Sequence, residues 1–168
     1  MVAKLLMPLV ATAFAASSAN ALHPVQSFRT VLPKVKRQTK VTVLLPATLP
    51  TAGPSPKLYA TGTGSAKGSD LELAGAPGCG EADACFIASF VATKGGKLPN
   101  QSSFVKLTLA GGDSARYHPI TCGGSCAPAT LWFTHKGVLY TWQLKDAPRD
   151  AKTAMAKAAD SAIAAGPR

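Results

Sequence analysis

Apolar and polar residues alternate along much of the chain beyond residue 69, as they do in strands that bury one face. Short turns separate six segments that show this pattern. The segments predict strands near residues 70–74, 85–91, 103–109, 116–121, 129–134 and 138–144. Because the connections between them are short, we expect neighbouring strands to run antiparallel in a meander.

The last two segments form the clearest unit, a hairpin around the turn at His135, Lys136 and Gly137. A hairpin with an even-numbered loop pairs odd positions with even ones, so one face is predicted to belong to the core. That face carries Leu131, Phe133, Val138, Tyr140, Trp142 and Leu144.

The opposite face of this hairpin is rich in threonine and carries one large aromatic residue, Trp132. Phe104 and Lys106 fall on the same side of the predicted sheet, so the three residues are candidates for a binding platform. The alternative is that a second layer covers Trp132, since large aromatic side chains are usually well buried.

A helix is predicted over residues 148–164, where small apolar residues recur three and four positions apart. Asp146 is a candidate N-cap, Pro148 suits the first turn, and Gly166-Pro167 ends the helix. The apolar stripe is shallow, which favours packing across the sheet.

The region before residue 70 is less regular. Residues 41–45 predict a buried strand that Pro46 closes, and residues 57–61 predict a short strand. The glycine-rich stretch 62–68 is interpreted as a flexible turn, because a phosphate-binding loop of this composition would lead into a helix.

The pattern as a whole predicts an α+β fold, a curved antiparallel β-sheet of six to eight short strands in meander order with a packed C-terminal α-helix. The length suits one disulfide-containing domain, which we place at residues 41–168.

Residues 1–21 have the three parts of a secretory signal peptide, namely Lys4, an apolar run at 5–16 and the small-x-small sequence Ala19-Asn20-Ala21. The apolar run is shorter than the roughly 20 residues of a membrane-spanning helix. We therefore expect cleavage after Ala21 and a secreted or periplasmic mature chain, beginning at Leu22, without a transmembrane segment.

The formal net charge of +10 is concentrated in residues 22–40, the predicted basic N-terminal arm. This arm contains no acidic residue. Such a charge attracts an anionic envelope surface or an acidic polymer, and the alternative is a solvated arm that aids solubility. Nucleic acid is not an expected partner of an exported protein. The cations of the arm are Arg29 and the candidate binding residues Lys34, Lys36, Arg37 and Lys40.

Four cysteines form two tight clusters, Cys79 with Cys85 and Cys122 with Cys126. An even cysteine count in an exported domain predicts two structural disulfides rather than a redox, zinc or nucleophile site. A simple meander places the clusters at opposite ends of the sheet, which favours pairing within each cluster. Loop-closure entropy favours crossed bridges instead, so distance must decide the connectivity.

No catalytic residue, metal site or cofactor is predicted. The histidines His23, His118 and His135 do not form a metal-binding pair. Ser125 lacks the glycine two positions further on that a nucleophile elbow requires.

Several short core and turn segments are spread over most of the mature chain, and an alanine-rich helix follows them. They are Val43-Leu44-Leu45-Pro46, Leu49-Pro50, the strand at Cys85, Leu131-Trp132-Phe133 and Gly137-Val138-Leu139-Tyr140. In these segments the chain resembles a group of uncharacterised exported bacterial β-rich proteins. The resemblance implies an antiparallel sheet with a packed C-terminal helix, and it transfers no catalytic residue.

The leading hypothesis is an exported, non-enzymatic binding or envelope-associated protein whose basic arm contacts an anionic surface. Two alternatives stay open. One is a periplasmic carrier that holds a lipid or another hydrophobic small molecule in a half-barrel. The other is an enzyme with an unrecognised site that uses Ser125, His118 or the cysteines.

Overall fold

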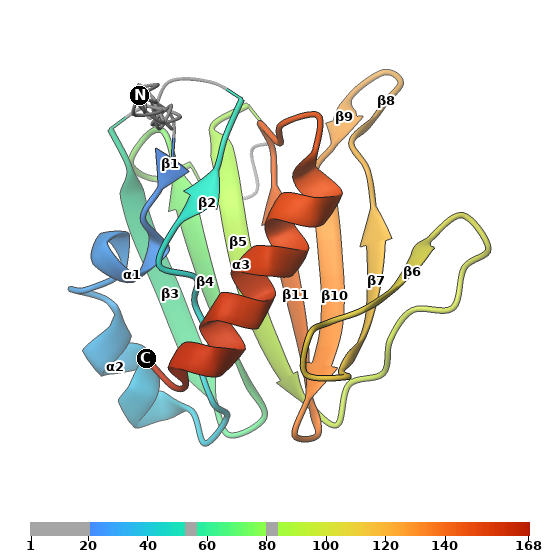
Figure 1. The fold of residues 1–168 in the computed structure, drawn as a ribbon. Helices are drawn as coiled ribbons and strands as arrows, with labels where there is room; N and C mark the ends of the chain where they lie inside the picture. Colours follow the sequence, from blue (N-terminus) through green and yellow to red (C-terminus); the bar gives the residue numbers. More distant parts are fainter. Residues whose placement is uncertain (1–20, 53–56, 80–83) are drawn as a thin grey trace, which may run out of the picture.

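The computed structural model describes residues 21–52, 57–79 and 84–168 (Figure 1). Within these ranges the chain forms three sheets and three helices. The predicted signal peptide lies outside the described residues except for Ala21.

Seven antiparallel strands form the main sheet, which is open (Figure 1). The predicted α+β fold with a C-terminal helix is therefore confirmed. From one edge to the other the strands are β3 (Tyr59–Ser65), β4 (Gly68–Ala74), β5 (Phe86–Lys94), β11 (Val138–Leu144), β10 (Ala129–His135), β7 (Ser114–His118) and β6 (Val105–Thr108).

The order is meander-like apart from one connection. β5 pairs with β11 rather than with β6. Residues 95–104 carry the chain from β5 to the far edge of the sheet, where β6 begins. Two meanders, β3-β4-β5 and β6-β7-β10-β11, thus meet side by side at the centre of the sheet.

Side chains of alternate residues on each strand form the core. One row of mutually paired positions crosses five strands, and every side chain in it is buried. The row consists of Leu71, Phe90, Trp142, Leu131 and Tyr117. The six hairpin residues predicted to face the core are likewise all buried, so the predicted partition of the hairpin is confirmed. Its two-residue turn, Lys136 and Gly137, has positive φ at both positions, as a type I′ turn requires.

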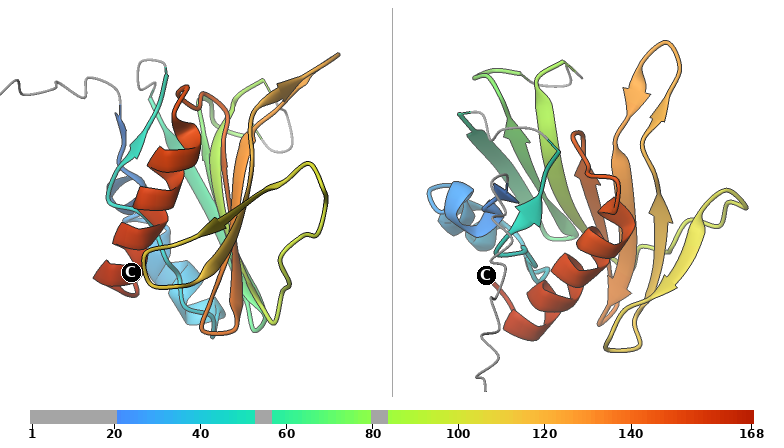
Figure 2. Two further views of the ribbon diagram at one scale, coloured as in Figure 1. Left: turned by 45° about the vertical axis from the view of Figure 1, so that its right-hand side comes forward. Right: turned by 45° about the horizontal axis from the view of Figure 1, so that its top comes forward.

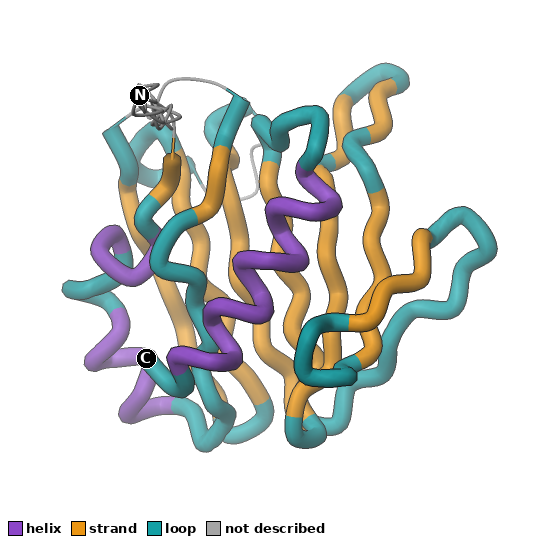
Figure 3. Tube along the Cα trace, viewed as in Figure 1, coloured by secondary structure: helices purple, strands orange, loops and turns teal. Residues whose placement is uncertain are grey.

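A second layer lies on one face of the sheet (Figures 1 and 3). We call this face the inner face and the opposite one the outer face. The layer consists of α1 (Pro24–Ser27), α2 (Leu32–Gln38), the ribbon of β1 (Ala21–Leu22) and β2 (Leu49–Pro50), and α3 (Ala151–Ala165). A further ribbon, β8 (Thr121–Cys122) with β9 (Cys126–Ala127), extends beyond the end of the sheet (Figure 2).

α3 begins three residues later than predicted, at Ala151. The amide of Ala151 bonds to the carbonyl of Pro148, so residues 148–150 form a turn that leads into the helix. Asp150 is the N-cap residue, without a side-chain capping bond. The predicted end is confirmed, because Gly166 has φ +77° and its amide caps the carbonyls of Ala162 and Ile163.

Two expectations for the region before residue 70 are wrong. Residues 41–45 are largely buried but form no strand; they cross the inner face as a loop (Figure 3). Their backbone bonds elsewhere, since the Tyr140 hydroxyl donates to the Thr42 carbonyl and the Arg168 amide to the Val43 carbonyl. The stretch 62–68 is mostly strand rather than a flexible turn, because β3 continues to Ser65, β4 begins at Gly68, and the turn consists of Ala66 and Lys67 alone.

Candidate functional site

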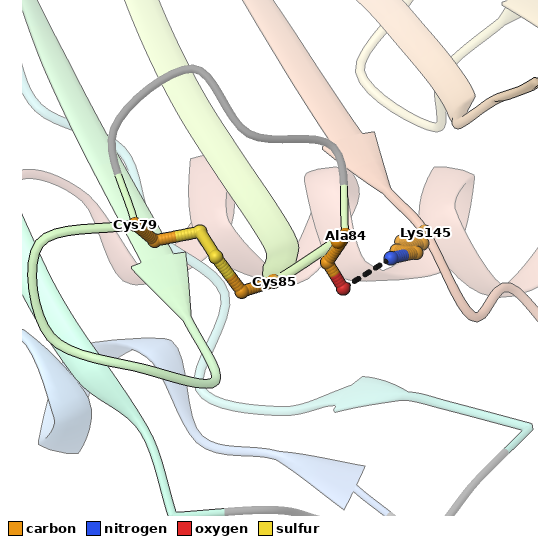
Figure 4. The surroundings of a disulfide bond; sticks show 4 residues. All are labelled: Cys79, Ala84, Cys85 and Lys145. Carbon is orange, nitrogen blue, oxygen red and sulfur yellow. Dashed lines mark hydrogen bonds between the residues drawn. A yellow bond between two sulfur atoms is a disulfide. The ribbon is translucent and has the colours of Figure 1, made fainter.

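The first disulfide, Cys79–Cys85, joins the middle of the connection from β4 to β5 to the last residue of that connection (Figure 4). Lys145 Nζ donates a hydrogen bond of 2.8 Å to the carbonyl oxygen of Ala84, beside the bridge. The Gly75 amide donates to the Cys85 carbonyl at the same distance. The bridge is therefore tied both to the end of β4 and to the end of β11.

The second disulfide, Cys122–Cys126, joins β8 to β9, and residues 121–127 are all exposed. Both bridges are the local pairs that were expected. The premise that the clusters lie at opposite ends of the sheet is wrong, because β5 and β10 both run antiparallel to β11 and hence start at the same end. The two loops stay apart nevertheless, since β11 lies between the strands that follow them.

The segment expected to be a basic arm, residues 22–40, folds as α1 and α2 against the inner face. Phe28, Leu32 and Val35 are buried in the core. The side chains of all cations of the segment are exposed, while the core holds the backbone that carries them. We call this surface the basic face; it consists of Arg29, Lys34, Lys36, Arg37 and Lys40.

Glycines on β3 bring α2 unusually close to the sheet. A Cβ atom on Gly62 would lie 2.8 Å from Val31 Cγ1, and one on Gly64 would lie 2.7 Å from the carbonyl oxygen of Val35. Gln38, at the end of α2, accepts a hydrogen bond from the Gly64 amide through its side-chain oxygen. The glycines that indicated a turn in the sequence therefore allow α2 to pack closely against the edge strand β3.

Carboxylates do not neutralise the basic face within the described part of the chain. The ion pair of the described residues joins His135 Nδ1 to Asp113 Oδ2 at 2.6 Å. It lies at the end of β10 and does not involve the basic face. No cation of the basic face takes part in an ion pair among residues 21–52, 57–79 and 84–168. The face therefore keeps its full charge of +5 toward solvent.

The predicted platform residues Trp132, Phe104 and Lys106 all lie on the outer face. The rings of Phe104 and Trp132 stack with centroids 4.7 Å apart and an interplanar angle of 22°. Lys106 lies two strands from Trp132 in the same cross-strand row, with Arg116 between them. Trp132 is half-buried, so no second layer seals it off.

The sequence reasoning missed two residues of this surface, Arg116 and His118. His118 meets the Phe104 ring edge to face, with centroids 5.2 Å apart. The missed signal was their spacing of two along β7, which places both on the face of Trp132. We call the set of Phe104, Lys106, Arg116, His118 and Trp132 the aromatic-cationic patch.

The His135 and Asp113 pair was also not predicted. A carboxylate at Nδ1 fixes the orientation of an imidazole, as in many catalytic dyads. Within the described residues, however, no hydroxyl or thiol is hydrogen-bonded to this imidazole. The pair joins the turn before β7 to the β10–β11 turn, which is a structural role.

The inner face is filled by core side chains rather than by a ligand-sized hollow in the part of the chain that the structure describes. Leu45, Leu49, Met155 and Ala159 cover it and are all fully buried. A hollow of about 100 Å³ beside Tyr140 is smaller than the roughly 300–1,000 Å³ of typical ligand pockets. Hollows of that size, about 320 Å³ between Thr48 and α3 and about 460 Å³ beside Tyr59, are open to solvent rather than enclosed by the sheet and its inner layer. This packing does not favour the lipid-carrier alternative.

The residues named for the enzyme alternative do not converge. All four cysteines are in disulfides, Ser125 lies in the exposed β8–β9 turn, and His118 contacts a phenylalanine ring. The described residues contain no group of three or more histidine, cysteine, aspartate or glutamate side chains that could hold a metal ion.

None of the helices among the described residues is long and apolar enough to cross a membrane. Comparisons of the chain with protein-family models, with curated proteins and with solved structures found no match. The candidate functional sites are therefore the two surfaces, the basic face and the aromatic-cationic patch.

Proposed function

We propose that this is an exported, non-enzymatic binding protein that attaches to an anionic surface of the cell envelope through its basic face. The observation that carries the proposal is that five exposed cations, none in an ion pair within the described residues, lie on α2 and on the segments directly before and after it, which are anchored in the core. Cations on a folded backbone bind an anionic surface without the entropy cost of ordering an unfolded arm.

The position of the cations on α2 supports this role. Leu32 and Val35 lie one turn apart and face the sheet, so Lys34 and Arg37 fall on the opposite side of the helix. Lys36 and Arg37 also lie in the last turn, where the helix dipole favours positive charge. The sequence thus directs Leu32 and Val35 inward and Lys34 and Arg37 outward, with Lys36 exposed at the side of the helix.

Export is supported by the features of residues 1–21 and by the two disulfides, because such bridges persist in oxidising compartments. An envelope outside the cytoplasmic membrane offers anionic lipid headgroups and acidic polymers. Each cation near an anionic membrane surface contributes about 1 kcal/mol of binding free energy.

Cosedimentation of the mature protein with lipid vesicles tests the proposal. We expect binding to vesicles that contain phosphatidylglycerol, no binding to pure phosphatidylcholine, and loss of binding as salt is raised. Neutralising four cations of the basic face in Lys34→Gln, Lys36→Gln, Arg37→Gln and Lys40→Gln together should weaken binding at least tenfold.

The matched control removes the same charge elsewhere. Lys67, Lys94, Lys97 and Lys152 are exposed and lie outside the basic face, so their combined substitution by glutamine should change binding less than threefold. Equal losses in the two variants would show that net charge alone acts, and would overturn the proposal. Absence of wild-type binding at low salt would do the same.

A further inference from the structure

The outer face carries a second surface that is distinct from the basic face. Two neighbouring rows of paired positions meet at the β6, β7 and β10 edge of the sheet. Lys106, Arg116 and Trp132 are direct partners in one row, and His118 pairs with Thr130 in the next. Phe104 immediately precedes β6 and closes the surface on that side.

The aromatic rings of this patch pack against one another and remain partly exposed to solvent. Phe104 stacks on Trp132 and contacts His118, and all three side chains are half-buried. The core aromatics differ, since Phe90 and Trp142 are buried almost completely. The helices and the β1–β2 ribbon lie on the inner face (Figures 1 and 2), and on the outer side the connection 95–104 passes next to the patch and leaves its rings partly exposed.

The cations of the patch have unused donors. Arg116 Nη1 donates to the Ala115 carbonyl at 2.9 Å, which orients the guanidinium and leaves its other N–H groups free for an anion. Lys106 is exposed and has no side-chain bond within the described residues. Thus a fixed guanidinium and a mobile ammonium border one aromatic stack.

Acidic side chains on the same face lie well away from the patch. Asp70 and Glu72 are on β4, which is separated from β10 by β11 and β5. Three strand spacings amount to roughly 14 Å. At that distance solvent and salt screen most of their charge from Arg116, so the patch is locally cationic.

We propose that the aromatic-cationic patch binds an acidic glycan, a chain of sugar rings that carry carboxylate groups. Sugar rings present apolar C–H faces that pack on an aromatic side chain. Their carboxylates accept charge-assisted hydrogen bonds from arginine and lysine. The patch is an open sheet surface rather than an enclosed pocket, which fits a polymer that extends past both ends of the site.

Single-stranded nucleic acid is the competing polymer with anionic charge and flat rings. Proteins that bind it stack successive bases on separate aromatic side chains. Here Phe104 and Trp132 stack on each other and so offer one platform instead of two. The choice of a glycan also rests on the proposed export, which removes the protein from most nucleic acid.

Titration of the mature protein with a hexamer of galacturonic acid, followed by calorimetry, tests the inference. We expect binding that is at least tenfold tighter than for a neutral glucose hexamer. Phe104→Ala, Trp132→Ala and Arg116→Gln should each weaken it about tenfold or more. Tyr59→Ala is the control, because Tyr59 is a half-buried aromatic on the other edge strand beside Lys57.

The results separate this inference from the proposed function. Phe104→Ala should keep wild-type binding to anionic vesicles, and the basic-face variant should keep binding of the acid hexamer. If the hexamer is lost in the basic-face variant and kept in Phe104→Ala, the patch is not the site. Tighter binding of an oligothymidylate through the same residues would replace the glycan by nucleic acid and overturn the inference.

Discussion

Tyr140 links the core to a loop that has no strand partner. Its side chain is 1% exposed, and its ring stacks on Phe133 with centroids 4.9 Å apart. Its hydroxyl donates a hydrogen bond of 2.9 Å to the Thr42 carbonyl. One residue thereby packs within the inner layer and satisfies an acceptor of the irregular segment 41–48.

Tyr140 should make stability depend on alkaline pH. Burial raises the pKa of Tyr140 to about 12, whereas an exposed tyrosine has a pKa of about 10. Between these values the unfolded chain releases a proton that the folded chain keeps, so the free energy of unfolding falls as pH rises. Below about pH 10 both states hold the proton and the group adds no pH dependence.

Tyr140→Phe should therefore cost about 1 kcal/mol at pH 7 through the lost hydrogen bond. The substitution should also make the fall in the free energy of unfolding above about pH 10 shallower. Part of that fall should remain, because burial also raises the pKa of Tyr117. Urea unfolding at pH 7 to 11.5 measures both effects, with Tyr59→Phe as control. An unchanged alkaline decline in Tyr140→Phe would refute the assignment.

Side-chain orientation was the property most open to prediction from the sequence. The spacing of two correctly assigned six core residues of the hairpin and put Trp132, Phe104 and Lys106 on the other face. The role of Gly62 was not predictable in the same way. It depends on where α2 lies, which no local pattern encodes.

Helices and strands that bury one face were easier to predict than segments that are buried without regular secondary structure. α3 has a repeating apolar stripe, and the strands have their alternation. Residues 41–45 are as apolar as a core strand, but they cross the inner face where no sheet edge is available. Hydrophobicity predicted their burial, and a strand would have needed a hydrogen-bonding neighbour as well.

The contact of α2 with β3 should be sensitive to a single methyl group. A Cβ atom on Gly62 would lie 2.6 Å from Leu71 Cδ2 and 2.8 Å from Val31 Cγ1, so these buried and half-buried side chains, or the elements that carry them, must shift. We expect Gly62→Ala to destabilise the protein by about 1–3 kcal/mol, the usual cost of overpacking. Thermal and urea unfolding measure the change.

Gly111→Ala is the matched control for that substitution. Nothing lies within 4 Å of a Cβ atom there and φ is not positive, so the change should be neutral or slightly stabilising. If the two alanine variants have the same stability, α2 does not pack on β3 as described.

At the scale of the whole molecule, the neighbours in the sheet were the hardest feature to predict. Alternation defines the face of each strand but not which strand lies beside it. The pairing of β5 with β11 depends on the connection 95–104, which has no periodic pattern. This connection also places Phe104 in the aromatic-cationic patch, so the proposed binding surface depends on the one departure from a simple meander.

The same topology separates the two proposed sites. α2 lies at the β3 edge and the aromatic-cationic patch at the β6 edge. Six strand spacings amount to roughly 29 Å. A protein held on a surface by its basic face would therefore keep the patch free for a second, polymeric partner.

Both proposals depend on export, and the N-terminal region offers a sharp test of it. Leu22 is 1% exposed and pairs with Leu49 in the β1–β2 ribbon, so processing must leave this residue in place. We expect the protein from a periplasmic extract to begin at Leu22 and to weigh about four hydrogens less than residues 22–168, because each disulfide removes two.

Intact mass under non-reducing conditions, combined with thiol alkylation, checks both parts of this prediction. No alkylation is expected before reduction, since all four cysteines are paired. The variant Ala19→Arg with Ala21→Arg removes the small residues of the cleavage site and should retain residues 1–21. A wild-type chain found in the cytosol with residues 1–21 attached and reactive thiols would contradict export. The basic face would then not meet the anionic envelope surface, so the proposed function would fail as well.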